Sequence, residues 1–385
     1  MTNEKIYDVA VIGAGMFGSA AGKYLAAAGL KTLIIGAAEP QNWQTHDGVF
    51  GSHYDEARIT RIVDPDPYWG ELAAQSITQY PVIEQQSGIK FHHNVGCLRV
   101  AALQENGESA QRCCMENGDQ QNAEYKVLSG EKTAQQFPYF HFPRDIDAIW
   151  ESGQAGYINP RRLVQAQLKI AQNNDAILKR ETAQEIIPEN DGIKIRTREG
   201  QIYHTQKVLL AAGAYTKFLL KHSDELQTHP VQVMLAEVEG PSADMPCLIY
   251  MLQNHPQIED IYLLPPIQYP DGKWYLKIGA FPHHLQIAKT ENELKNWFQH
   301  EPSDEETHAT KQALKELMPA LKVLSYRVVP CAWTYAPQTQ PYIKILEKED
   351  AKGRIAVATG GCGRGAKSSD AIGKLGAELF LDKQN

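Results

Sequence analysis

Three glycines near the N-terminus, Gly13, Gly15 and Gly18, have the spacing of a turn that binds a pyrophosphate. In such a turn the first glycine permits a tight bend and the second lets the backbone approach the phosphates, while the third lets the following helix pack closely on the strand. Residues 6–12 predict a buried strand before the turn, and residues 19–28 predict an alanine-rich helix after it. Because a helix N-terminus supplies positive potential, this unit predicts a dinucleotide site.

A second glycine-rich segment, residues 360–365, joins a predicted strand at 354–359 to a predicted helix at 368–381. It predicts another helix N-terminus directed at the same cofactor, where it would stabilise negative charge. The first motif leaves the choice between NAD and FAD open. The acidic residue that usually binds the adenosine ribose is replaced by Gly36, so Glu39, the nearest acid, or backbone groups are expected to bind it instead.

The composition excludes several classes of protein. The 385-residue chain has 46 acidic and 38 basic residues, and its net charge of −8 argues against a nucleic-acid partner. No apolar run reaches the ~20 residues that cross a bilayer, and no convincing secretion signal is present. The cysteines show neither a disulfide framework nor a zinc pattern. The sequence therefore predicts a cytoplasmic enzyme without a metal.

The order of predicted elements indicates two interleaved domains. Parallel-type strands at both ends of the chain and at 207–212 suggest one α/β domain, whereas 229–281 alternates like antiparallel sheet. Residues 105–122 are polar and predict an exposed loop or hairpin. We expect a nucleotide-binding domain and an α+β substrate domain, formed by residues 1–85, 150–225 and 325–385 and by residues 86–149 and 226–324, respectively.

Four segments in chain order resemble the monomeric sarcosine oxidase and N-methyltryptophan oxidase family of FAD-dependent amine oxidases. They are residues 11–18, 51–61 (similar to Gly-Ser-His-His-Gly-Asp-Thr-Arg-x-x-Arg), 331–335 (similar to Cys-Met-Tyr-Thr) and 363–367 (similar to Gly-His-Gly-Phe-Lys). Weaker matches lie at 211–215 and 275–279. The resemblance spans nearly the whole chain. It implies a Rossmann-like FAD-binding domain interleaved with an antiparallel-sheet substrate domain, in a monomer that oxidises an amine to an imine and reduces O2 to hydrogen peroxide.

The resemblance also implies roles for individual residues. Cys331 would carry FAD through a thioether to the flavin 8α-methyl group, and Lys277 would activate O2 by stabilising developing superoxide. Arg58 would lie near the flavin as a catalytic residue, and Tyr262 would match an active-site tyrosine. His53 would belong to the same turn as Arg58, in either a catalytic or a structural role. The other residues expected at the cofactor are Gly13, Gly15, Gly18, Gly213, Gly363, Gly365 and Lys367.

Arg61 and Lys367 would bind a substrate carboxylate, because two converging cations give charge-assisted hydrogen bonds that orient the reacting carbon. The chain departs from the family at this pocket. Arg364 replaces a histidine and Phe281 replaces another, while Ala366 replaces an aromatic residue and Trp333 a tyrosine. Arg364 would therefore add a third cation. We infer that a larger secondary amine, N-methyl or cyclic amino acid, aromatic or acidic, is a better substrate than sarcosine.

The sequence is also compatible with other functions. The same fold could oxidise glycated (fructosyl) amino acids, or act as a flavin amine dehydrogenase with another electron acceptor. An NAD-dependent dehydrogenase would leave Cys331 and the C-terminal glycines unexplained. A nucleotide-binding protein without catalysis is suggested by Gly36 and the altered pocket alone.

Overall fold

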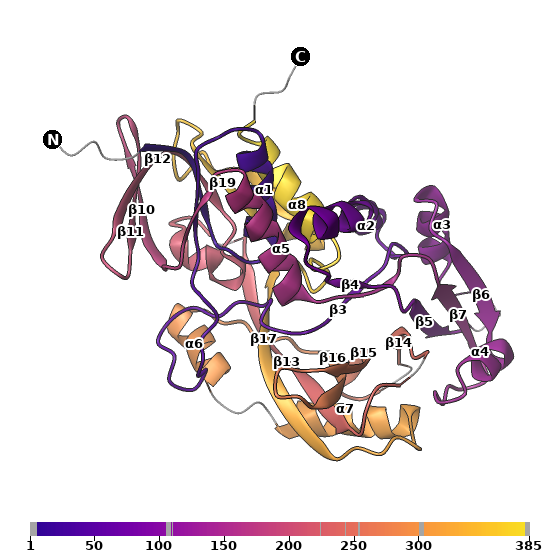
Figure 1. The fold of residues 1–385 in the computed structure, drawn as a ribbon. Coiled ribbons are helices and arrows are strands. Elements are labelled where there is room, and N and C mark those ends of the chain that lie inside the picture. Colours follow the sequence, from indigo (N-terminus) through magenta and orange to yellow (C-terminus); the bar gives the residue numbers. More distant parts are fainter. Residues whose placement is uncertain are drawn as a thin grey trace.

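The computed structural model describes residues 6–104, 109, 111–223, 225–242, 244–252, 255–299 and 304–381. Two large sheets and one small sheet dominate the described chain (Figure 1). The helices are α1 (Met16–Ala27), α2 (Pro67–Ser87), α3 (Arg112–Gln120), α4 (Gly130–Gln136), α5 (Pro160–Asn173), α6 (Glu291–Gln299), α7 (Asp304–Leu317) and α8 (Ser369–Glu378), with short 3₁₀ turns η1 (Gly213–Leu219) and η2 (Pro337–Thr339).

The first sheet has a parallel centre in the order β19–β12–β1–β2–β9. An antiparallel hairpin, β10–β11, extends it beside β12, and β18 pairs with β19. These strands are β1 (Ile6–Ile12), β2 (Thr32–Ile35), β9 (Ile177–Lys179), β10 (Ala183–Glu189), β11 (Gly192–Thr197), β12 (Ile202–Leu210), β18 (Tyr342–Ile345) and β19 (Ile355–Thr359).

Strand β1 is buried on both faces, as expected for the centre of a parallel sheet. Val9 and Val11 pack toward α1, α5 and α8, whereas Ala10 and Ile12 pack in a second cluster on the other face. The three helices stand together over one side of the sheet (Figure 1). Segments from both ends of the chain therefore belong to one sheet.

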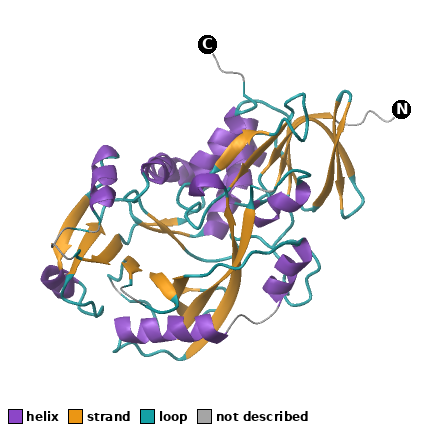
Figure 2. Ribbon diagram, turned by 180° about the vertical axis from the view of Figure 1, so that it is seen from behind, coloured by secondary structure: helices purple, strands orange, loops and turns teal. Residues whose placement is uncertain are grey.

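The second sheet is antiparallel except for the pair β14–β5, and its order is β17–β13–β16–β15–β14–β5–β7–β6. Helix α7 packs on it through Ala313, Leu314 and Leu317, at the far end of the molecule from the helices of the first sheet (Figure 2). Its strands are β5 (Cys97–Ala102), β6 (Tyr125–Ser129), β7 (Ile146–Glu151), β13 (Gln227–Val238), β14 (Cys247–Met251), β15 (Ile258–Gln268), β16 (Trp274–Pro282) and β17 (Ser325–Tyr335).

Two local expectations differ from the structure. The predicted boundary at 325 assigns β17 to the nucleotide-binding domain, but β17 pairs along its length with β13 in the second sheet. The prediction of a loop or hairpin at 105–122 is wrong for its second half, which contains α3. Residues 105–108 and 110 lie outside the described residues. Helix α3 forms because Cys114 packs against Val63 and Ile149, so tertiary contacts override a polar local sequence.

A small sheet, with the order β3–β8–β4, joins the two domains, and α2 follows β3. Its strands are β3 (Arg58–Thr60), β4 (His92–His93) and β8 (Gly156–Ile158). The predicted fold class, an α/β nucleotide-binding domain combined with an antiparallel-sheet domain, is confirmed. Within the described residues, no helix has both the length and the apolar character needed to cross a membrane.

Candidate active site

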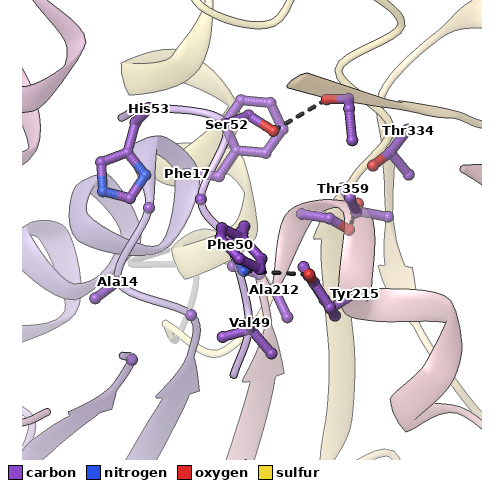
Figure 3. Close-up of a pocket in the computed structure, with 18 of the residues that line it drawn as sticks. Ala14, Phe17, Val49, Phe50, Ser52, His53, Ala212, Tyr215, Thr334 and Thr359 are labelled. Carbon is purple, nitrogen blue, oxygen red and sulfur yellow. Dashed lines mark hydrogen bonds between the residues drawn. The ribbon is translucent and has the colours of Figure 1, made fainter. Parts of the chain in front are cut away.

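A cavity of about 320 Å³ opens at the carboxyl ends of β1, β2 and β12. Its wall combines distant stretches of the chain, among them 12–17, 35–37, 49–54, 181–184, 211–215 and 331–334. Two hydrogen bonds attach the 49–54 loop to the opposite wall (Figure 3). The Phe50 N–H donates to the Tyr215 hydroxyl (3.2 Å), and the Ser52 hydroxyl donates to the Ala332 carbonyl (3.0 Å).

The glycine turn after β1 is so closely packed against its neighbours that side chains at Gly13 and Gly18 would collide with backbone atoms. Gly13 has a φ of +110°, and a Cβ there would overlap the carbonyl group of Ala211. A Cβ on Gly18 would overlap the carbonyl oxygen of Gly13, so the third glycine permits the close packing of α1. Gly15 lines the cavity and precedes α1, whose first N–H groups have no helical acceptors. These residues fit a bound pyrophosphate.

His53 lies at this turn. Its ring stands beside Gly15 and near Ala14 (Figure 3). Burial, with a smaller contribution from Arg161 and other arginines, lowers the pKa of His53 to about 3. The imidazole is therefore neutral at pH 7. The structure thus places His53 at the dinucleotide end of the cavity, where a neutral ring can donate or accept a hydrogen bond.

Cys331 and Arg58 share another part of the cavity wall. Cys331 is 8% exposed, and its Sγ lies 3.7 Å from Arg58 Nη2. The same guanidinium donates to the carbonyl oxygens of Ser52 (2.8 Å) and Ala57 (3.0 Å). These hydrogen bonds hold the positive charge of the Arg58 guanidinium beside the Cys331 sulfur.

Asp55 organises two of the predicted cations. This buried carboxylate pairs with Arg58, lies 2.5 Å from Lys277 Nζ, and accepts a hydrogen bond from the Tyr269 hydroxyl (2.8 Å). Lys277 is 1% exposed and also donates to the Ala57 carbonyl (2.8 Å). Burial and the neighbouring Arg58 lower the pKa of Lys277, whereas the Asp55 carboxylate favours its charged form.

Tyr262 lies next to this group. Lys277 Nζ is 5.9 Å from the centre of the Tyr262 ring, and the ring crosses Gly279, where a Cβ would collide with it. Burial raises the pKa of Tyr262, so its hydroxyl stays protonated at neutral pH. Among the described residues that line the cavity, neither Tyr262 nor Lys277 is found. Arg58, which shares Asp55 with Lys277, does line the cavity.

The three cations predicted to bind a carboxylate meet at one buried carboxylate, Asp64. Asp64 Oδ2 lies 2.8 Å from Arg61 Nη1 and 3.2 Å from Lys367 Nζ, and Oδ1 lies 3.4 Å from Arg364 Nη1. The Asp64 side chain is fully buried, whereas 40% of the Arg364 side chain is exposed. Lys367 also donates to the Trp69 carbonyl (3.1 Å). We call Arg61, Asp64, Arg364 and Lys367 the Asp64 cluster.

The charges of the Asp64 cluster depend on one another. Burial alone would raise the pKa of Asp64, but Lys367, Arg61 and Arg364 together hold it well below its usual range. Burial lowers the pKa of Lys367 to about 8, although Asp64 opposes the shift. At neutral pH the cluster therefore carries three positive charges and one negative charge, and its net charge attracts an anion.

An aromatic wall lies near the cavity. Phe281 stacks on Trp333 with ring centres 5.1 Å apart and an angle of 28°, and Tyr335 lies 6.4 Å from Trp333. Trp333 lines the cavity, and its ring packs beside Gly363. Two of the four positions at which the sequence departs from the family that it resembles, 281 and 333, thus form one apolar surface.

Comparison with known proteins decides the family. The model of the protein family described as "FAD dependent oxidoreductase" (DAO) matches residues 8–379 of this chain. The chain belongs to this family. It is 25% identical to monomeric sarcosine oxidase from Bacillus sp. (strain NS-129) and 26% identical to N-methyl-L-tryptophan oxidase from Yersinia pestis (strain Pestoides F), over 97% and 98% of this chain and 92% and 95% of the relatives. A variant of NikD, an unusual amino acid oxidase, has a similar fold, with a TM-score of 0.80 at 19% identity over 99% of this chain and 95% of that one.

Family membership confirms that this is an FAD-dependent oxidoreductase. Apart from Gly18, which packs against Gly13, and Glu39, the predicted residues fall into three groups around its cavity. Gly13, Gly15, Gly213, Gly363, Gly365, His53, Arg58 and Cys331 line the cavity. Arg61, Arg364 and Lys367 join the Asp64 cluster, and Lys277 and Tyr262 lie beside Asp55. Glu39 is held by Arg161 through two hydrogen bonds, of 2.7 and 2.5 Å, and is not among the described residues that line the cavity.

Sequence reasoning missed Asp55 and Asp64. Each lies three residues from an arginine, at Arg58 and Arg61, and such spacing usually indicates a local ion pair in a turn. The segment of the resembling family has glycine where this chain has Asp55. That change was the available signal, because a carboxylate beside a predicted basic pocket must pair with one of its cations.

Proposed function

We propose that this protein is an FAD-dependent oxidase of N-substituted amino acids, which converts the C–N bond to an imine and produces hydrogen peroxide. One observation carries the proposal. The turn at 363–367 lines the cavity through Gly363, Gly365 and Ala366, and it also supplies Arg364 and Lys367 to the Asp64 cluster. The same turn thus contributes residues both to the cofactor cavity and to the Asp64 cluster, which would bind an anion.

When bound, FAD accepts a hydride equivalent from a carbon next to nitrogen and passes two electrons to an acceptor. The protein's contribution is to bind and orient the amine. The partly exposed guanidinium of Arg364 is the member of the Asp64 cluster best placed to meet a substrate carboxylate, with Arg61 and Lys367 behind it. Holding the carboxylate there would orient the α-carbon, which is worth several orders of magnitude in rate.

We expect sarcosine to be a poor substrate. The stacked pair of Phe281 and Trp333 replaces polar groups of the resembling family with an apolar surface, which favours an aromatic or cyclic side chain. In a screen of N-methyl, cyclic and fructosyl amino acids, measured by oxygen uptake and peroxide formation, an N-methyl amino acid with an aromatic side chain should exceed sarcosine in kcat/KM by at least about tenfold. Sarcosine as the best substrate would contradict this specificity.

Covalent attachment of FAD through Cys331 is part of the proposal. Arg58 places positive charge beside Sγ, where the reacting thiolate would carry negative charge. Cys331 would lose its thiol proton and bond to the flavin 8α carbon, which loses a hydrogen. The thiol proton and the C–H proton would leave to solvent, and the two electrons would pass by way of the flavin to O2.

The thioether has a simple test. Acid precipitation of the purified protein should give a yellow pellet, whereas Cys331→Ser should give a white pellet and a yellow supernatant. Cys113→Ser, which changes an exposed cysteine, serves as the control and should retain the yellow pellet. A yellow supernatant from the unchanged protein would refute the linkage and leave FAD as a dissociable cofactor.

A flavin amine dehydrogenase is the second candidate, favoured by the pairing of Lys277 with Asp55. For this candidate, the carboxylate would offset the charge that promotes the reaction with O2. Electrons would then pass to a quinone-type or dye acceptor. We also propose a cytoplasmic monomer; the support is the resemblance to the monomeric amine oxidases.

A further inference from the structure

The end of β2 cannot supply the carboxylate that usually binds the adenosine ribose. A Cβ on Gly36 would overlap the backbone of Ala14, so a side chain at this position would disrupt the turn at the pyrophosphate. The nearby Glu39 is bound on both carboxylate oxygens by Arg161. The polar group that holds the ribose must therefore come from elsewhere in the wall.

The neighbouring strand, β9, ends at the same place. It pairs in parallel with β2, with Ile35 opposite Lys179, and the Gly36 N–H donates to the Lys179 carbonyl (3.0 Å). Parallel strands bring their carboxyl ends to one edge of a sheet, where ligands bind. Glu181, two residues beyond the end of β9, lines the cavity together with Gly36.

The Glu181 side chain is held in place but lacks one partner. Oε1 accepts a hydrogen bond from the Tyr203 hydroxyl (2.7 Å). Oε2 is buried and has no hydrogen-bond partner in the part of the chain that the structure describes. A buried carboxylate oxygen without a donor is costly, and a hydroxyl group of a molecule bound in the cavity would supply the donor.

We propose that Glu181 binds the adenosine ribose of FAD, in place of the carboxylate that is absent at Gly36. A carboxylate repels phosphates, which are expected at the Gly13–Gly15 turn, and it needs a neutral donor such as a ribose hydroxyl. The Tyr203 hydroxyl orients the side chain so that Oε2 accepts from the ribose. The inference rests on FAD as the cofactor and is independent of the proposed amine substrate.

The test measures binding of FAD to the full-length apoprotein, in a Cys331→Ser background so that binding is reversible. Glu181→Ala should weaken FAD binding at least about tenfold, because a hydrogen bond to a charged group is lost. An FAD analogue whose adenosine ribose lacks both hydroxyls should bind to the parent protein more weakly than FAD does. Glu181→Ala should not change the affinity for this analogue. Glu185→Ala is the matched control: Glu185 is exposed, pairs with Arg196, and should leave FAD binding unchanged.

Three results would overturn the proposal. Glu181→Ala could bind FAD as tightly as the parent protein. It could weaken FAD and the dideoxy analogue equally, which would indicate a general structural effect. Finally, a flavin dinucleotide with hypoxanthine in place of adenine could be bound equally by both proteins, which would assign Glu181 to the adenine amino group. Flavin fluorescence titration distinguishes these outcomes without any measurement of catalysis.

Discussion

Replacement of Lys277 by methionine should slow reoxidation by O2 about 10²–10³-fold, the usual cost of removing a preorganised charge from developing negative charge. Reduction by the amine substrate should change little, because the substrate carboxylate is expected at Arg364, Arg61 and Lys367. The variant should still fold, since Arg58 and Tyr269 continue to pair with the buried Asp55. Anaerobic stopped-flow reduction followed by mixing with O2 measures the two rates separately.

Lys273→Met is the matched control for this experiment. Lys273 immediately precedes β16 but is exposed and pairs with Glu237 (2.8 Å), so both rates should match the parent protein. The opposite outcome would be a parent enzyme that reacts slowly with O2, transfers electrons quickly to a dye, and is unaffected by Lys277→Met. That result would favour the dehydrogenase and show that Asp55 has neutralised Lys277.

The fold and the cofactor turn were predictable because their signals are local. Gly13 is required by a positive φ, Gly18 by a close helix–strand contact, and both stand in one short motif. Buried strands such as β1 leave continuous apolar runs that need no knowledge of their neighbours. The sequence therefore identifies which elements surround the cavity before their contacts are known.

The charge balance of the site was not predictable in the same way. Asp64 meets Lys367 and Arg364 only after folding brings together positions that are about 300 residues apart. Likewise, the free oxygen of Glu181 becomes meaningful only once β9 lies beside β2. A sequence indicates which residues carry charge, whereas the fold determines which charges are already paired.

Asp64→Asn should destabilise the protein by about 3–5 kcal/mol at pH 7, the cost of removing one partner from a buried ion pair. The cations depress the pKa of Asp64 in the folded state. Its contribution is therefore present above the unfolded pKa of about 3.9 and is lost as the pH falls below that value. Urea unfolding should show a larger difference between the proteins at about pH 5 than at acid pH, and the difference should decrease again at the pH where Lys367 loses its proton in Asp64→Asn but keeps it in the parent protein. Asp47→Asn, at an exposed pair with Lys295, should have little effect.

The same substitution tests whether the Asp64 cluster binds the substrate. Removing the internal carboxylate frees Arg61 and Lys367, so KM for a carboxylate substrate should fall at pH 6. It also removes the charge that supports protonated Lys367, whose pKa is about 8 in the parent protein. KM should rise above pH 8 in the parent and from a lower pH in Asp64→Asn, because anion binding needs the protonated lysine. If the role of Asp64 is purely structural, Asp64→Asn should be less stable than the parent protein but should show the same dependence of KM on pH.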